Sequence, residues 1–177
     1  MNSFLEIGEP IVIPLQSNWF ENGYYVYTVV INYQNENYFY IGMTGDRKHV
    51  IARSPFYRMS GHFQLGKSTQ NQIIKGIERV FSVSAKDDNV LTAMNFTYYA
   101  WKIKPFVNSI TSEEHHLNRI VTEKIESNLI VLCQQHFGTE KVFNYNKSRK
   151  DFTGYETETK NIFNQLLAKI ELPKDGE

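Results

Sequence analysis

The first strongly patterned part of the chain is a pair of segments rich in β-branched and aromatic residues. Residues 24–33, YYVYTVVINY, follow the turn signal Asn22-Gly23, and residues 37–44, NYFYIGMT, follow the polar stretch QNEN at 34–37. This composition between turn signals is typical of β-strands. We therefore expect an antiparallel hairpin whose second strand is ended by Gly42 and Gly45.

The rest of the chain alternates helical spacing of apolar residues with one further strand pattern. We expect a short helix over residues 52–62, a clearer helix over 69–81 and a third strand over 90–103, VLTAMNFTYYAWKI, after the polar turn KDDN. Thr111 and Glu114 form a capping-box signature that begins the best-marked helix, which Gly138 ends. Residues 157–172 predict an amphipathic closing helix that packs back onto the sheet.

This order of elements predicts an α+β fold in which a small three-stranded antiparallel sheet is flanked by helices. The chain has 177 residues, of which 41% are hydrophobic and 14% aromatic, so it is long enough and apolar enough for one packed domain. We expect an N-terminal extension at 1–22, the main domain at 23–146, and a C-terminal tail with its packing helix at 147–177.

The cysteine usage and the N-terminal residues bear on location. Cys133 is the single cysteine, so no internal disulfide forms, and MNSFLEIGEP has neither a basic region nor a long apolar region of the kind that signal peptides carry. No stretch approaches 18 uninterrupted apolar residues. We expect a cytoplasmic protein that does not span a membrane.

Charge is balanced over the whole chain and uneven along it. The 19 basic residues match the 19 acidic residues, so net charge alone does not indicate a nucleic-acid binder. Between Arg47 and Lys104, however, ten Lys and Arg stand against three acidic residues. Either this middle third is a solvated surface with uneven charge, or it contacts a polyanion.

Two motif matches do not carry the function. Residues 61–69, GHFQLGKST, fit the P-loop pattern G-x-x-x-x-G-K-[ST], but the preceding SPFYRMS does not form the buried strand that a phosphate-binding loop requires. Cys133 and His136, taken with His115 and His116, resemble a zinc set only loosely, because their spacing lacks a second paired element. Neither a nucleotide hydrolase nor a zinc protein is favoured.

A different set of residues does point to chemistry. Side chains alternate along strands, so Tyr27 shares a face with Tyr25 and Val29, and Tyr40 shares a face with Tyr38 and Gly42; a register that joins these faces places two phenols side by side. Arg58 and His62 are spaced i, i+4, on one side of the predicted helix. Glu126 lies among core residues of the long helix, where a carboxylate is either a hydrogen-bonded structural group or a metal ligand.

These residues resemble the motifs of the GIY-YIG endonuclease family. The resemblance rests on Tyr25-Val-Tyr27 in place of GIY, on Tyr40-Ile-Gly42, on Arg58-x-x-x-His62, on Glu126-Ser-Asn-Leu-Ile and on Phe143-Asn144. It covers about residues 23–146, and the predicted order of strands and helices is the family's order. The resemblance implies a DNA endonuclease that uses one divalent metal, Mg²⁺ or Mn²⁺.

Roles for individual residues follow from the same resemblance. Glu126 would hold the metal, Arg58 would contact the scissile phosphate, and Tyr27 is the favoured general base, with His62 tuning it and Tyr40 hydrogen-bonding the phosphate or its water. Which of the two tyrosines is the base stays open. The residues expected to contact DNA are Arg47, Lys48, Arg53, Lys67 and Asn144.

The chemistry of hydrolysis places one condition on this assignment. A tyrosine with a pKa of about 10 is a poor base unless a neighbouring cation or imidazole lowers that pKa, so we expect Arg58 and His62 to do so. Some family members carry a lysine directly after YIG, whereas this chain has Met43-Thr44, and Lys48 or Arg47 are the candidates to replace that cation.

The sequence thus predicts a metal-dependent phosphodiester hydrolase that acts on DNA. The alternative is a catalytically impaired DNA-binding protein that retains the fold, which the Met43 substitution and the insertions around the motifs motivate. Within the enzyme prediction, a homodimer is possible, because the chain is compact and lacks an obvious separate domain for reading DNA.

Overall fold

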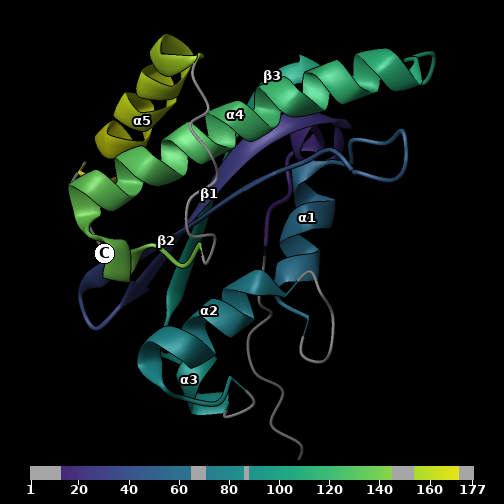
Figure 1. The fold of residues 1–177 in the computed structure, drawn as a ribbon. Helices are drawn as coiled ribbons and strands as arrows, with labels where there is room; N and C mark the ends of the chain where they lie inside the picture. The colour runs from purple at the N-terminus through teal and green to yellow at the C-terminus, as the bar shows by residue number, and fades with distance from the viewer. Residues whose placement is uncertain (1–12, 65–70, 86–87, 145–153, 172–177) are drawn as a thin grey trace, which may run out of the picture.

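The fold is built on one three-stranded antiparallel sheet (Figure 1). The computed structural model describes residues 13–64, 71–85, 88–144 and 154–171. The strands are β1 (Gly23–Tyr33), β2 (Glu36–Met43) and β3 (Asn95–Pro105), in the order β2-β1-β3. The described helices are α1 (Pro55–His62), α2 (Gln72–Phe81), α3 (Asp88–Thr92), α4 (Ser112–Phe137) and α5 (Glu156–Ile170), with short 3-10 segments η1 (Ser17–Phe20) and η2 (Thr139–Lys141). The predicted α+β class with a three-stranded antiparallel sheet is confirmed.

The β1–β2 hairpin turns more tightly than the sequence pattern indicated. Gln34 and Asn35 both have positive φ, 52° and 65°, and they alone separate the two strands. Two residues with positive φ are the connection whose twist matches that of the paired strands. The strand β2 therefore begins at Glu36, inside the predicted turn at 34–37.

The third strand was predicted too early. Residues 90–92 belong to α3, and β3 begins only at Asn95 and runs to Pro105. A short apolar run such as VLTAM fits a buried helix turn as well as a strand, and periodicity alone does not separate the two. Here Val90 and Leu91 pack against the sheet from the end of a helix.

The helix ends follow local capping chemistry. The helix α1 begins at Pro55 rather than at Ala52, because Ser54 caps it by accepting from the backbone N–H of Tyr57 and proline suits the first helical position. The predicted capping box of α4 is present at Thr111 and Glu114, and Gly138 ends the helix. The helix α2 begins at Gln72, and the predicted start of that helix at 69–70 lies outside the described residues.

The sheet lies between two layers of helices, which Figure 1 shows on opposite sides of it. On one face, Val26 and Val30 pack with Phe39 and with residues of α4 and α5. On the other face, Tyr27, Val29 and Ile31 of β1 pack with residues of β2 and α2, such as Tyr40 and Ile73. The central strand β1 is therefore buried from Gly23 to Ile31, whichever way a side chain points.

The described helices include none that combines the length and the apolar character needed to cross a bilayer.

Candidate functional site

The hairpin register brings the two motif tyrosines to one face of the sheet. Tyr27 pairs with Gly42, and Tyr40 pairs with Val29, so the two phenol rings lie diagonally across the strand pair with centroids 6.4 Å apart. Gly42 is required by this arrangement, because a Cβ added there would lie 2.3 Å from the Tyr27 hydroxyl. The predicted pairing of the two tyrosine faces is confirmed.

The helix α1 places His62 directly against both tyrosines. His62 Nε2 lies 2.6 Å from the Tyr27 hydroxyl, and the imidazole meets the Tyr40 ring edge-on with centroids 4.8 Å apart. Both Tyr27 and His62 are buried, and Tyr27 has 0% of its surface exposed. The Tyr27–His62 hydrogen bond is therefore shielded from water.

Arg58 lies one turn before His62 on α1, and its guanidinium interacts with the Tyr27 hydroxyl. The Nε–H group of Arg58 is buried and has no hydrogen-bond partner among the described residues. A buried arginine with a donor left unused is costly on its own and suits an anion.

The prediction that Arg58 and His62 lower the pKa of Tyr27 below its usual value is wrong. Burial raises the pKa of Tyr27 above 10.0; the Arg58 guanidinium opposes this rise, and the Glu126 carboxylate adds to it. Burial also raises the pKa of Tyr40 well above its usual value, since a phenolate is poorly solvated there. Both phenols are protonated at neutral pH, so neither is a base unless it passes its own proton on.

A third tyrosine, Tyr98 of β3, completes the aromatic cluster. Its ring stacks on Tyr27 with centroids 5.0 Å apart and an interplanar angle of 19°, and its buried hydroxyl lacks a partner within the described part of the chain. Tyr98 pairs with Val29 across the β1–β3 ladder, which sets it on the same face as Tyr27. Tyr98 was not predicted, because the residues of β1 and β3 alone do not determine the register between the two strands.

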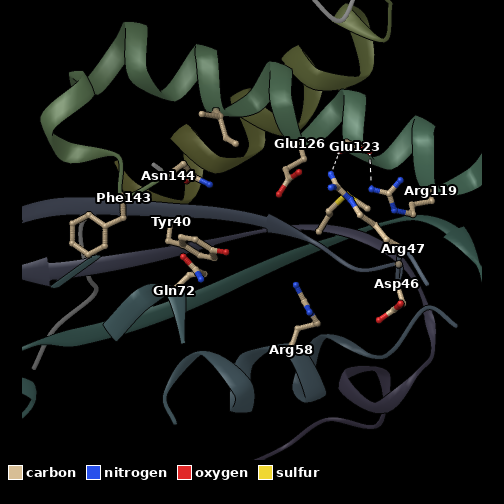
Figure 2. Close-up of a pocket in the computed structure, with 13 residues that line it drawn as sticks. Tyr40, Asp46, Arg47, Arg58, Gln72, Arg119, Glu123, Glu126, Phe143 and Asn144 are labelled. Carbon is tan, nitrogen blue, oxygen red and sulfur yellow. Dashed lines mark hydrogen bonds and ion pairs between the residues drawn. The ribbon is translucent and has the colours of Figure 1, made fainter. Parts of the chain in front are cut away.

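Glu126 of α4 lies across a cleft from these groups. The cleft has a volume of about 380 Å³ and opens at the β2 edge of the sheet, where α4 from one layer and α1 and α2 from the other all reach. Its lining residues are Tyr40, Met43, Gly45, Asp46, Arg47, Arg58, Gln72, Arg119, Glu123, Glu126, Ile130, Phe143 and Asn144. Figure 2 shows Glu126 pointing into the space between α4 and the side chains of Tyr40 and Arg58.

The cleft thus gathers most of the predicted site. Tyr40, Arg58 and Glu126 line it, whereas Tyr27 and His62 lie behind Tyr40 and do not. Of the two tyrosines, Tyr40 is the one that faces the space in which a substrate would lie.

The donor set suits a hard divalent cation held by few protein ligands. Within the described residues, no group of three or more His, Cys, Asp and Glu side chains is arranged to hold a metal ion. Glu126 is 7% exposed and faces the cleft, and Mg²⁺ commonly keeps several waters while it binds one or two carboxylates and a substrate phosphate. A single carboxylate across the cleft from the Arg58 guanidinium is compatible with that coordination.

Two further charged residues of α4 line the cleft and were not predicted. Arg119 Nη2 donates to Glu123 Oε2 at 2.8 Å, and Arg47 Nη2 donates to Glu123 Oε1 at 2.8 Å (Figure 2). Arg119, Glu123 and Glu126 are spaced i, i+4, i+7 and so share a helix face. That spacing was visible in the sequence and could have found them once the helix was placed.

The loop between β2 and α1 is fixed to α4 by histidine. His115 Nε2 lies 3.0 Å from the Asp46 carbonyl oxygen, and His115 Nδ1 lies 2.7 Å from the Tyr24 hydroxyl. Asp46 in turn accepts from the backbone N–H groups of Lys48 and His49. His115 therefore has a structural role here, which agrees with the rejection of a zinc set.

Asn144 lines the cleft, but its side-chain amide is engaged with the backbone of β2. Its Oδ1 accepts from the Ile41 N–H at 2.9 Å, and its Nδ2 donates to the Ile41 carbonyl at 2.7 Å. Arg79 of α2 donates to the neighbouring Phe143 carbonyl at 2.8 Å. Asn144 thus ties the segment after α4 to the strand that carries Tyr40.

The other predicted DNA contacts lie apart from the cleft or outside the described residues. Lys48 and Arg53 are exposed and do not line it, and the Arg53 guanidinium stacks 3.9 Å from the centre of the Tyr57 ring. Lys67 falls outside the described residues. The segment before GHFQLGKST is the helix α1 rather than a strand, which removes the structural context of a P-loop.

Comparisons with family models, with curated proteins and with solved structures give no match to this chain. The GIY-YIG resemblance therefore stays a prediction from the motifs.

Proposed function

We propose that this chain is a metal-dependent endonuclease that hydrolyses DNA phosphodiester bonds in the cleft between β2, α1 and α4. The observation that carries the proposal is that the Tyr40 phenol, the Arg58 guanidinium and the Glu126 carboxylate line one cleft, while the buried Tyr27–His62 pair packs against Tyr40. A transferring phosphoryl group needs neutralisation of its charge and an activated water, and these are the side chains that supply both.

Arg58 binds and orients the scissile phosphate. Its fork-shaped guanidinium matches two phosphate oxygens, and its buried Nε–H supplies a donor that no described residue uses. A divalent cation at Glu126, when bound, would polarise the phosphate and offset the charge that develops on it.

The water is activated by the tyrosine pair together with His62. Because burial keeps both phenols protonated, Tyr40 accepts the proton of the attacking water only as it passes its own proton to Tyr27, and Tyr27 passes its own proton to His62 Nε2, 2.6 Å away. Because Tyr40 faces the cleft and interacts with Tyr27, we assign Tyr40 to the water and Tyr27 to the imidazole in this relay. The hydroxide oxygen forms a bond to phosphorus as the bond between phosphorus and the sugar oxygen breaks, and the leaving oxygen takes a proton from solvent.

The full burial of Tyr27 favours a second candidate, a DNA-binding protein that has lost cleavage. A phenol with 0% exposed surface and a raised pKa does not meet a water unless the cleft changes shape. Supercoiled plasmid that stays intact with Mg²⁺ and with Mn²⁺, although the protein binds DNA, would favour this candidate.

The decisive experiment compares plasmid cleavage by the wild type with cleavage by Glu126→Ala and Arg58→Ala, with and without EDTA. We expect cleavage by the wild type alone and its loss in EDTA. Lys169→Ala, on the exposed face of α5, is the control that should cut normally. Cleavage that persists in Glu126→Ala would overturn the metal assignment.

Partner and location belong to the same proposal. DNA is the proposed substrate. We also propose a homodimer and a cytoplasmic location. Sedimentation of the full chain with and without DNA tests the dimer.

A further inference from the structure

We propose that Arg119 and Arg47, joined through Glu123, form a second phosphate-binding subsite in the cleft, distinct from the one centred on Arg58 and Glu126. This inference rests on the proposed function, because it gives the nucleic-acid strand a second point of contact beside the scissile bond.

The charges of Arg47, Glu123 and Arg119 do not cancel within this trio, whereas over the whole lining the three arginines are matched by Asp46, Glu123 and Glu126. The two oxygens of Glu123 each accept from one guanidinium, Oε2 from Arg119 and Oε1 from Arg47, both at 2.8 Å. One carboxylate therefore pairs with two guanidinium groups, so these three side chains together carry one positive charge. Arg119 and Glu123 are 11% and 14% exposed, so this surplus charge is screened less than it would be on an open surface.

Arg119 is held in place with a donor to spare. Its aliphatic stem runs beside Gly45, where an added Cβ would lie 3.4 Å from Arg119 Cγ, and Gly45 has a φ of +113° that favours glycine. The Nε–H of Arg119 is buried and finds no partner in the described ranges. A fixed guanidinium with an unused N–H group is preorganised for a phosphate.

Arg47 is positioned by its neighbour Asp46. The Asp46 backbone N–H donates to the Ile51 carbonyl at 2.9 Å, and His115 holds the Asp46 carbonyl from α4. Arg47, with 68% of its side chain exposed, therefore extends from an anchored point at the mouth of the cleft.

The two subsites are centred at different points along α4. Arg119 reaches Glu123, which comes three residues before Glu126, an axial separation of about 4.5 Å. Successive phosphates of one strand of duplex DNA advance by about 3.4 Å along its axis. The arginine pair thus meets a phosphate beyond the scissile one, and it supplies a second cation in a chain that has Met43 after YIG.

The test measures binding of a fluorescently labelled duplex DNA to the full chain, with Ca²⁺ in place of Mg²⁺, over a series of salt concentrations. The variants are Arg119→Met, which keeps the aliphatic stem, Arg47→Ala, their double variant, and Lys169→Ala as a matched loss of charge on α5. Circular dichroism checks that each variant folds.

We expect either single substitution to remove the surplus charge. Each should weaken binding roughly tenfold and lower the slope of log affinity against log salt by about 0.9. The double variant should lose further slope and affinity, because Glu123 is then a carboxylate without either arginine and repels the phosphates. Lys169→Ala should match the wild type.

Unchanged slopes in Arg119→Met and Arg47→Ala would overturn the subsite, even if the wild type cuts DNA. Should Arg119→Met not fold, Arg47→Ala decides alone, since its side chain is exposed. A wild type that binds with the expected slope but does not cut with Mg²⁺ defeats the proposed hydrolysis and leaves the subsite standing. A wild type that does not bind duplex DNA defeats both.

Discussion

Replacing Gly42 by alanine tests the packing of the tyrosine cluster without any assumption about function. The new Cβ would lie 2.3 Å from the Tyr27 hydroxyl oxygen and 2.4 Å from Cζ, so the ring must move. The ring has little room to do so, because it is fully buried, stacks on Tyr98 and hydrogen-bonds His62 at 2.6 Å.

The size of the effect follows from three contributions. Overpacking a tight core costs about 1–3 kcal/mol, and a broken buried hydrogen bond adds about 1–3 kcal/mol. Alanine in a strand recovers about 0.5–1 kcal/mol of backbone entropy relative to glycine. We expect Gly42→Ala to lower the free energy of unfolding by about 2–4 kcal/mol, within the range reported for single core changes.

Urea unfolding followed by circular dichroism and by the fluorescence of the two tryptophans measures this free energy. The same substitution is then made in a Tyr27→Val background, where the clashing atoms are gone. There we expect Gly42→Ala to raise the free energy of unfolding by about 0.5–1 kcal/mol, because only the backbone-entropy contribution remains. Equal costs in both backgrounds would refute the claim that Tyr27 is what excludes a side chain at position 42.

Three further predictions concern stability. Tyr98→Phe removes a buried hydroxyl without a described partner and keeps the stacked ring. It should leave the free energy of unfolding unchanged or raise it by about 1 kcal/mol. A lower free energy of unfolding in urea would show that the hydroxyl is hydrogen-bonded. Thr111→Ala removes the side-chain cap of α4 and should cost about 0.5–2 kcal/mol by thermal unfolding, whereas no change would mean that the capping box contributes nothing. The pKa values of Tyr27, Tyr40 and Tyr98 are raised by burial, so the unfolded chain loses these protons first as pH rises. The stability that these three tyrosines contribute is complete below pH 10.0 and is lost as pH rises above it. An alkaline titration followed by tyrosinate absorbance checks this. If the absorbance of all tyrosines rose together before the chain unfolded, the prediction would be wrong.

Local chemistry made some elements predictable. The capping box at Thr111 and Glu114 and the stop at Gly138 gave α4 its ends, because both ends are set by residues within one turn. The start of β3 failed for the opposite reason, since whether residues 90–92 form a helix or a strand depends on packing against the sheet rather than on their own pattern.

In the candidate site too, some features followed from the sequence and others required the fold. Spacing within one element indicated that Arg58 and His62 share a helix side and that Tyr27 and Tyr40 lie on matching faces. The partnership of Glu123 with Arg47 joins residues 76 positions apart and required the fold. The raised pKa of Tyr27 also required it, because burial depends on every layer that covers the strand.

The sequence by itself indicated the class of fold, the hairpin and part of the cleft lining, including Tyr40, Arg58 and Glu126, because periodicity and capping act over a few neighbouring residues. Only the tertiary structure decided the register of β3, the stacking of Tyr98 on Tyr27, the arginine pair on Glu123 and the protonation of the buried phenols. Each of these depends on distances between segments remote in the chain, and such distances are set by packing of the whole domain.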